Sequence, residues 1–268
     1  MAEAAAAATA RESPLLLRLL RRYYSLLAVF LLWEIIGRSG FVSDVFMPPF
    51  TQVLGKWYEL SLYGNLVWHV TASMQRAMLG FSSAVLIGIP LGLCMGWFRQ
   101  VGGFFDPIVS IIYPIPKVGF VPLLMVWFGI GEESKVAVIF LATVFPLIIN
   151  TSAGVQGVSK QMVWAALSMG ATKGEVLRRV VLPHVLPQIF AGLRISMALT
   201  WALLFVAEMV ASSSGLGFLI LFRQRMLRTD EVFVGILTIA VFGYTFDRLV
   251  GLAGRRLCHW YYSMGAQV

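Results

Sequence analysis

Two charged residues, Lys117 and Glu208, lie inside long apolar stretches of the sequence. A charge at membrane depth is costly, so residues of this kind are suspected of a functional role. Pro114 and Pro116 interrupt the stretch around Lys117, and broken helices at this depth are tolerated mainly where they line a cavity. We therefore predict that these four residues border a path through a bilayer. The alternative for both charges is buried pairing that fixes the helix packing.

Arg76 and Arg194 lie near the starts of two other apolar stretches. A long basic side chain at such a position can bury its stem in apolar surroundings and keep its charge in water. We expect these two arginines either to extend towards the membrane surface in this way or to form buried pairs.

The segment 157–187 carries a second pattern, which suits a mechanical connector. Small residues let a helix lie close in the groove of a partner, a glycine permits a sharp turn, and a proline ends a helix. The residues in these roles are Trp164, Ala165, Ala166, Gly170, Ala171, Leu182 and Pro183. Their spacing predicts a short helix, a joint at Gly170 and a stop at Pro183. The alternative is an ordinary amphipathic loop.

Two further patterns concern charge and packing. Arg223, Arg225 and Arg228 form a basic cluster, which could attract anions over a long range, contact acidic groups of another protein or face solvent.

The glycines at positions 88, 92 and 96 form one small face on a helix, which predicts close helix packing within or between protomers.

Motifs for covalent chemistry are missing from the sequence. It contains no phosphate-binding G-x-x-x-x-G-K-[ST], no H-E-x-x-H and no G-x-S-x-G. The two cysteines are far apart, and the three histidines are scattered singly. We therefore predict no enzymatic activity, no metal and no cofactor bound by this chain.

The composition is that of an integral membrane protein. Hydrophobic residues make up 59% of the chain and charged residues 13%, against about 25% charged in a soluble domain. A membrane helix needs about 20 apolar residues. The sequence predicts an all-α protein with six spans, at about 23–37, 77–97, 107–131, 136–158, 195–210 and 232–250, and an external amphipathic helix over 51–62.

Basic residues set the predicted orientation. They collect before the first span, after the second, between the fourth and fifth and after the sixth, and such residues mark cytoplasmic loops. Both termini are therefore expected in the cytoplasm, with a tail over 1–22 and a membrane domain over 23–268. The net charge of +8 then reflects topology and not nucleic-acid binding. The cluster at 223–228 falls on the opposite side, against the rule.

The connector pattern resembles the cytoplasmic signature of permeases from ATP-binding-cassette (ABC) importers, although Trp164 stands where that family usually has Glu. Further motifs resemble the nitrate, taurine and aliphatic-sulfonate branch of these permeases. They are Met47-Pro48-Pro49-Phe50, Gly88-Ile89-Pro90-Leu91-Gly92, Asp106-Pro107, Tyr113-Pro114-Ile115-Pro116-Lys117, Trp127-Phe128-Gly129-Ile130-Gly131, Gly170-Ala171-Thr172, Gly192-Leu193-Arg194, Ala207-Glu208-Met209 and Gly215-Leu216-Gly217.

This resemblance implies a type I importer fold in a bacterial inner membrane and a set of partners. These are a second copy of the chain, two ATP-binding subunits that carry ATP and Mg, and an external substrate-binding protein. The segment 157–187 would be the coupling loop to the ATPase. The branch implies a small anion as substrate, such as a sulfonate, nitrate, bicarbonate or an organic acid, or alternatively a vitamin precursor. A stand-alone secondary transporter, using Lys117 and Glu208, is the alternative from another class.

Overall fold

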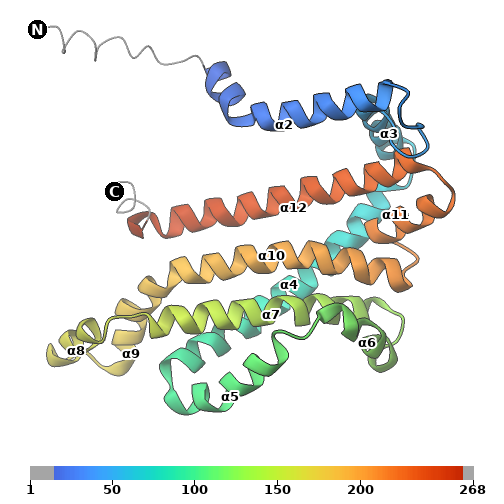
Figure 1. Cartoon of the computed structure of the whole chain (residues 1–268). Coiled ribbons are helices and arrows are strands. Elements are labelled where there is room, and N and C mark those ends of the chain that lie inside the picture. Colours follow the sequence, from blue (N-terminus) through green and yellow to red (C-terminus); the bar gives the residue numbers. More distant parts are fainter. Residues whose placement is uncertain (1–14, 262–268) are drawn as a thin grey trace, which may run out of the picture. The chain divides into compact units, whose positions relative to one another are not determined.

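The computed structural model describes residues 15–261, and every regular element in that range is helical, as predicted (Figure 1). The longer elements are α2 (Leu15–Arg38), α3 (Phe50–Leu62), α4 (Leu66–Trp97), α5 (Arg99–Ile112), α6 (Val121–Phe128), α7 (Glu132–Gln156), α8 (Lys160–Ser168), α10 (Leu182–Ala211), α11 (Leu216–Arg225) and α12 (Thr229–Leu257). The short ones are the 3-10 turn η1 (Lys117–Phe120), α9 (Lys173–Val176) and the π-helical turn η2 (Leu177–Val181).

The described chain divides into two compact units. The first consists of residues 15–63 and 223–234, so it contains α2, α3 and the first turns of α12. The second consists of residues 64–222 and 235–261. It contains α4 to α10, most of α11 and the long remainder of α12.

Within residues 15–261, four helices are long and apolar enough to cross a bilayer: α4, α7, α12 and the continuous helix Lys173–Val210 that includes α10. A fifth span results if the bent pair Arg99–Ile112 and Lys117–Phe128 counts as one. The remaining predicted span, at about 23–37, falls on α2, whose apolar run is bracketed by Arg22 and Glu34, and it stays a prediction. The predicted tail falls partly on residues 1–14, outside the described range.

Several predicted boundaries are wrong, and each has a physical reason. α4 begins at Leu66 and not near residue 77, because the polar side chains of its first turns are buried with partners. The predicted span 107–131 is no single helix. The chain turns by 90° between α5 and η1, where Pro114 and Pro116 cannot donate backbone hydrogen bonds. The external helix predicted over 51–62 is α3.

The packing of the second unit is built on α7, which lies between α4 and α10 (Figure 1). The predicted glycine face of α4 makes the first contact possible. A Cβ atom on Gly92 would lie 2.7 Å from the Ile148 carbonyl oxygen, and one on Gly88 would lie 3.0 Å from the Leu147 Cβ. These glycines therefore pack within the protomer, against the backbone of α7.

Gly92→Ala should lower the stability of the chain by about 1–3 kcal/mol, because the added methyl group overpacks the α4–α7 contact. Gly103→Ala in α5 is the matched control, since a Cβ there meets nothing within 4 Å. It should leave stability unchanged or raise it by up to about 1 kcal/mol through helix propensity. Thermal unfolding of both purified variants in detergent checks the pair. Equal midpoints would contradict the close approach of α4 and α7.

Candidate functional site

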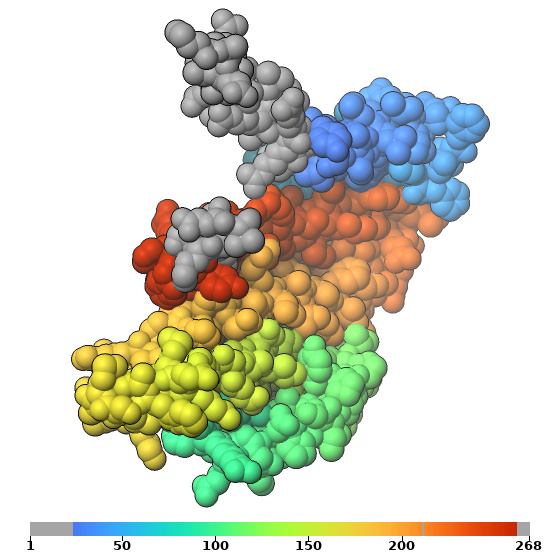
Figure 2. All heavy atoms as spheres, turned by 60° about the vertical axis from the view of Figure 1, so that its left-hand side comes forward, coloured from blue at the N-terminus to red at the C-terminus, as the bar shows by residue number. Residues whose placement is uncertain are grey.

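The connector segment forms α8, α9 and η2, beyond the ends of α7 and α10 (Figure 1). The residues of α8, in yellow, lie at the surface (Figure 2). The segment is therefore a helical structure of its own and not an irregular loop. Its helical content agrees with the sequence prediction, while a coupling role for its residues stays a prediction.

Gly170 makes the sharp turn after α8. Its φ angle is +87°, in the left-handed region that glycine adopts without strain. The amide of Gly170 donates to the Leu167 carbonyl at 3.0 Å, and the amide of Ala171 donates to the Ala166 carbonyl at 3.1 Å. This pair of bonds is the Schellman pattern, which satisfies the last carbonyls of a helix. The chain then starts α9 with a capping box between Thr172 and Glu175.

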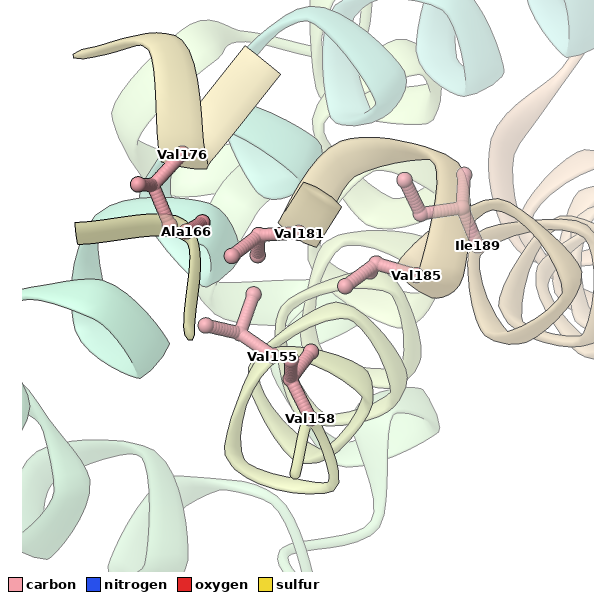
Figure 3. Packing of buried hydrophobic residues seen from close by; sticks show 7 residues of the cluster. All are labelled: Val155, Val158, Ala166, Val176, Val181, Val185 and Ile189. Carbon is pink, nitrogen blue, oxygen red and sulfur yellow. The ribbon is translucent and has the colours of Figure 1, made fainter. Parts of the chain in front are cut away.

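A cluster of buried aliphatic residues fixes this connector to the long helices (Figure 3). Its members are Val155, Val158, Ala166, Val176, Val181, Val185 and Ile189. They come from α7 and the turn after it, and from α8, α9, η2 and α10. Close-packed interiors transmit displacement instead of absorbing it. A force on α8 would therefore reach the ends of two long helices.

α8 also carries large apolar side chains that are exposed. Trp164, which is 64% exposed, lies on the side turned away from the buried Ala166, whereas Met162 and Met169 are exposed at other positions around the helix. An open cavity of about 320 Å³ lies beside it, lined by Ala166, Met169, Gly170, Ala171, Glu175, Val176, Arg179 and Val180. This surface can receive another protein, and it carries no acidic side chain on α8 itself.

The predicted stop at Pro183 is wrong. Residues Lys173–Val210 form one continuous helix that includes both Pro183 and Pro187. The amide of Leu182 bonds to the Leu177 carbonyl five residues back, so this turn is wider than an α-turn. A widened turn leaves room for the proline ring, which in an ordinary α-helix would clash with a carbonyl four residues earlier. The connector is thus continuous with the long helix.

A second group of residues surrounds Glu208, a residue of α10 whose side chain is buried against α4. Its carboxylate pairs with the Arg76 guanidinium at 2.7 Å. It also accepts hydrogen bonds from the Ser73 hydroxyl, at 2.8 Å, and from the Gly217 amide, at 2.9 Å. Arg76 is 2% exposed, so of the two alternatives for this residue the buried pair is confirmed and extension to the membrane surface is wrong.

Arg76 uses its remaining donors on two other elements. It donates to the carbonyl oxygen and the hydroxyl of Ser214, at 2.8 and 2.7 Å, and to both carboxylate oxygens of Glu132 at the start of α7. Two more residues of α4 hold the same turn. The ring nitrogen Nδ1 of His69 accepts from the Gly215 amide at 3.1 Å, and the Ser73 hydroxyl accepts from the Leu216 amide at 2.8 Å. This charge cluster ties α4, α7 and α10 to the turn before α11.

Lys117 lies at the bend between α5 and η1. Its ammonium group donates to the carbonyls of Ile112, Tyr113 and Ile115 at 2.7 to 2.8 Å. An ammonium has three donors, so all of them are used on backbone carbonyls at the end of the broken helix. Its position stabilises the bend that Pro114 and Pro116 create, while lining of a path by these residues stays a prediction.

The comparisons with known proteins agree with this arrangement. The family described as the binding-protein-dependent transport system inner membrane component matches residues 84–258. The taurine transport system permease protein TauC of Escherichia coli (strain K12) is 38% identical over 241 residues, which are 88% of each chain. The bicarbonate transport system permease protein CmpB of Synechococcus elongatus is 31% identical over 84% of each chain. The chain belongs to the family of binding-protein-dependent inner membrane components.

Solved structures support the fold of this inner membrane component. The inward-facing MetNI methionine ABC transporter matches with a TM-score of 0.60 at 18% identity, over 72% of this chain and 94% of that one. A bacterial ABC transporter involved in alginate import matches with a TM-score of 0.57 at 14% identity, over 90% of this chain and 98% of that one. The chain is therefore an all-α, multi-pass membrane protein with the ABC-importer permease fold.

Two of the three arginines in the basic cluster of this inner membrane component form ion pairs within the chain. Arg223 and Arg228 both pair with the buried carboxylate of Glu231, at 2.8 and 3.1 Å. Arg225 is exposed and has no partner among the described residues. Within this cluster, Arg225 is thus the group best placed to meet an anion or a partner protein.

Sequence reasoning missed how the charge cluster of this inner membrane component is assembled. Ser73, His69 and Glu132 carry no recognisable motif. His69 and Ser73 bond to the turn 214–217, and Glu132 bonds to Arg76, which itself bonds to Ser214 in that turn. Two signals in the sequence point to it: an arginine and a glutamate in separate apolar stretches, and the glycine-rich turn after Glu208. Arg194 forms a two-bond pair with Asp247 of α12 at 2.7 and 2.9 Å. The side chain of Arg194 is 56% exposed, so a pair is present but it is not buried.

Proposed function

We propose that this chain is the membrane subunit of an ATP-driven importer, and that its cargo is a small anion, a sulfonate first of all. Family membership supports the transport role. The names of the relatives, which refer to taurine, aliphatic sulfonates and bicarbonate, support the class of cargo. The observation that carries the coupling mechanism is the connector, with α8 held to α7 and α10 by one buried cluster.

The ATPase activity is proposed to reside on two separate subunits, which would bind ATP and Mg. This chain has no phosphate-binding loop of its own. The exposed surface of α8 around Trp164 is the proposed contact with such a subunit. Trp164 offers this contact an apolar side chain where an acidic residue is usual. Ala165, Ala166, Gly170, Ala171, Leu182 and Pro183 would shape and support the contact.

In the proposed cycle, two copies of the chain enclose a central path. An external binding protein delivers the anion on the side opposite α8, with both termini and α8 in the cytoplasm. ATP binding closes the two ATPase subunits and moves α8, and the buried cluster passes this movement to α7 and α10. The partners thereby shift an equilibrium between two packings of the helices.

A vitamin precursor is the alternative cargo within the same family, and a stand-alone secondary transporter is the alternative mechanism. The connector argues against a stand-alone secondary transporter, because a transporter without an ATPase subunit has no need of a surface helix anchored to the long helices in this way. The two intramembrane charges also suit a structural role. Glu208 forms an ion pair with Arg76, and Lys117 donates all three of its hydrogen bonds to backbone carbonyls.

The first test is purification of the chain from its native membrane in mild detergent, followed by mass spectrometry. We expect an ATPase subunit in equal amount to the chain. Vesicles containing the recovered complex and its binding protein should then take up labelled taurine or an alkanesulfonate only with ATP. A chain that purifies alone and transports without ATP would contradict the proposal. ATP-dependent uptake of bicarbonate alone, or of a vitamin precursor, would correct only the cargo.

A further inference from the structure

The strongest feature outside the connector and the charge cluster is α3, whose orientation is fixed by α2. Phe50 stacks on Phe30 with 4.5 Å between ring centroids, and the indole nitrogen of Trp33 donates to the Pro48 carbonyl at 3.0 Å. The Glu34 carboxylate accepts hydrogen bonds from the amide and hydroxyl of Thr51, at 2.9 and 2.8 Å. These three contacts with α2 hold the start of α3, so the helix cannot turn freely about its axis.

With 3.6 residues per turn, the side chains of α3 divide into three faces. The first is turned into the protein and contains the buried residues Val53 and Leu60, with the half-buried Lys56 between them. The second, which we call the polar face, is exposed and contains Gln52, Gly55 and Glu59. The third, which we call the apolar face, contains Leu54, Trp57, Tyr58 and Leu62, each between 40% and 65% exposed. Ser61 lies among them, and its hydroxyl donates to the Trp57 carbonyl at 2.7 Å.

We propose that the apolar face of α3 lies in the interface of the bilayer, with the helix parallel to the membrane plane. A helix in this position has three surroundings: protein on one side, lipid below and water above. The three faces of α3 match them one by one. Amphipathic helices of this kind bury their apolar side at the boundary between headgroups and acyl chains.

The residue types on the apolar face favour lipid over another protein. Trp and Tyr are enriched where the membrane meets water, because their rings are amphipathic, and this face carries Trp57 and Tyr58. It carries no charged residue, whereas a docking surface that stays wet between encounters is normally rimmed by polar groups.

Aromatic side chains continue along the chain after this face. Tyr63, which follows α3, and Trp68, in the first turn of α4, are exposed as well, and rings of this kind favour the boundary between membrane and water.

Spin labelling of the full chain in phosphatidylethanolamine and phosphatidylglycerol vesicles tests this placement. Cys94 and Cys258 are first replaced by alanine. Single cysteines are then introduced as Leu54→Cys, Tyr58→Cys and Leu62→Cys, with Gln52→Cys and Glu59→Cys as matched controls on the polar face. Collision rates with oxygen, which concentrates in lipid, are compared with those of a water-soluble nickel chelate.

On the apolar face we expect oxygen access to exceed nickel access several-fold, and the reverse on the polar face. Equal nickel access on both faces would overturn the proposal, because α3 would then lie in water. Labels on the apolar face that neither reagent reaches would also overturn it, since a second copy or another protein would then cover the face. All five positions are exposed, so the labelled variants should elute and unfold like the cysteine-free chain.

Discussion

Glu208→Ala should lower the free energy of unfolding by about 3–5 kcal/mol, the cost expected when one member of a buried ion pair is removed. The substitution leaves the buried Arg76 with a single carboxylate, that of Glu132, which is itself 61% exposed. It also leaves the Gly217 amide and the Ser73 hydroxyl without their shared acceptor. Thermal unfolding of the purified chain in detergent would measure the loss.

A double-mutant cycle separates the pair from its surroundings. Arg76→Met should be as damaging as Glu208→Met, whereas the chain with both substitutions should recover much of the loss, since no buried charge is then left unpaired. Glu133→Gln is the matched control, because Glu133 lies beside Glu132 in the sequence but outside the charge cluster, and it should change nothing. Additive losses in the double variant would contradict a direct interaction between Arg76 and Glu208.

Glu208→Gln distinguishes the structural role from the predicted role in the path. Glutamine keeps the acceptor for Gly217 and the shape of the side chain, so stability should fall less than with alanine. Uptake that falls in proportion to stability would support a structural role only. A stable variant without uptake would instead support the prediction that Glu208 borders the path.

Much of the fold can be read from the sequence because a bilayer imposes a simple rule. The apolar stretches of α4, α7 and α12 are long enough to span, and no other placement would hide them. The glycine face on α4 is equally readable, since small residues at a spacing of four have few uses other than close packing. The turn at Gly170 follows from residue type alone.

The parts of the fold that the sequence does not predict depend on contacts between residues that are distant in the sequence. His69, Ser73 and Arg76 look like a polar end to a span, yet α4 continues through them because their partners lie in residues 208–217. Pro183 looks like a helix stop, yet the π-turn before it makes room for the ring. The sharp bend after α5 combines the prolines with Lys117, whose ammonium group bonds to three backbone carbonyls at the end of the helix. No local pattern encodes such compensation.

Gly170→Pro should abolish ATP-driven uptake while leaving the chain in the membrane. Proline holds φ near −65° and cannot adopt the +87° of Gly170, and it removes the amide that bonds to Leu167. The turn after α8 must then open, and α8 loses its fixed position on the buried cluster. The long helices do not depend on this turn, so insertion should be unchanged. Uptake into vesicles and the amount of chain in membranes are the two measurements.

Two matched substitutions separate backbone geometry from loop composition. Gly170→Ala meets no atom within 4 Å and carries only the left-handed strain of about 1–2 kcal/mol, so uptake should be reduced but present. Lys173→Pro places a proline at the first position of α9. That position tolerates proline, and Thr172 before it already has the extended ψ of 157° that a proline requires. Uptake should survive there. Full uptake by Gly170→Pro would show that the position of α8 is not what transmits the work of ATP.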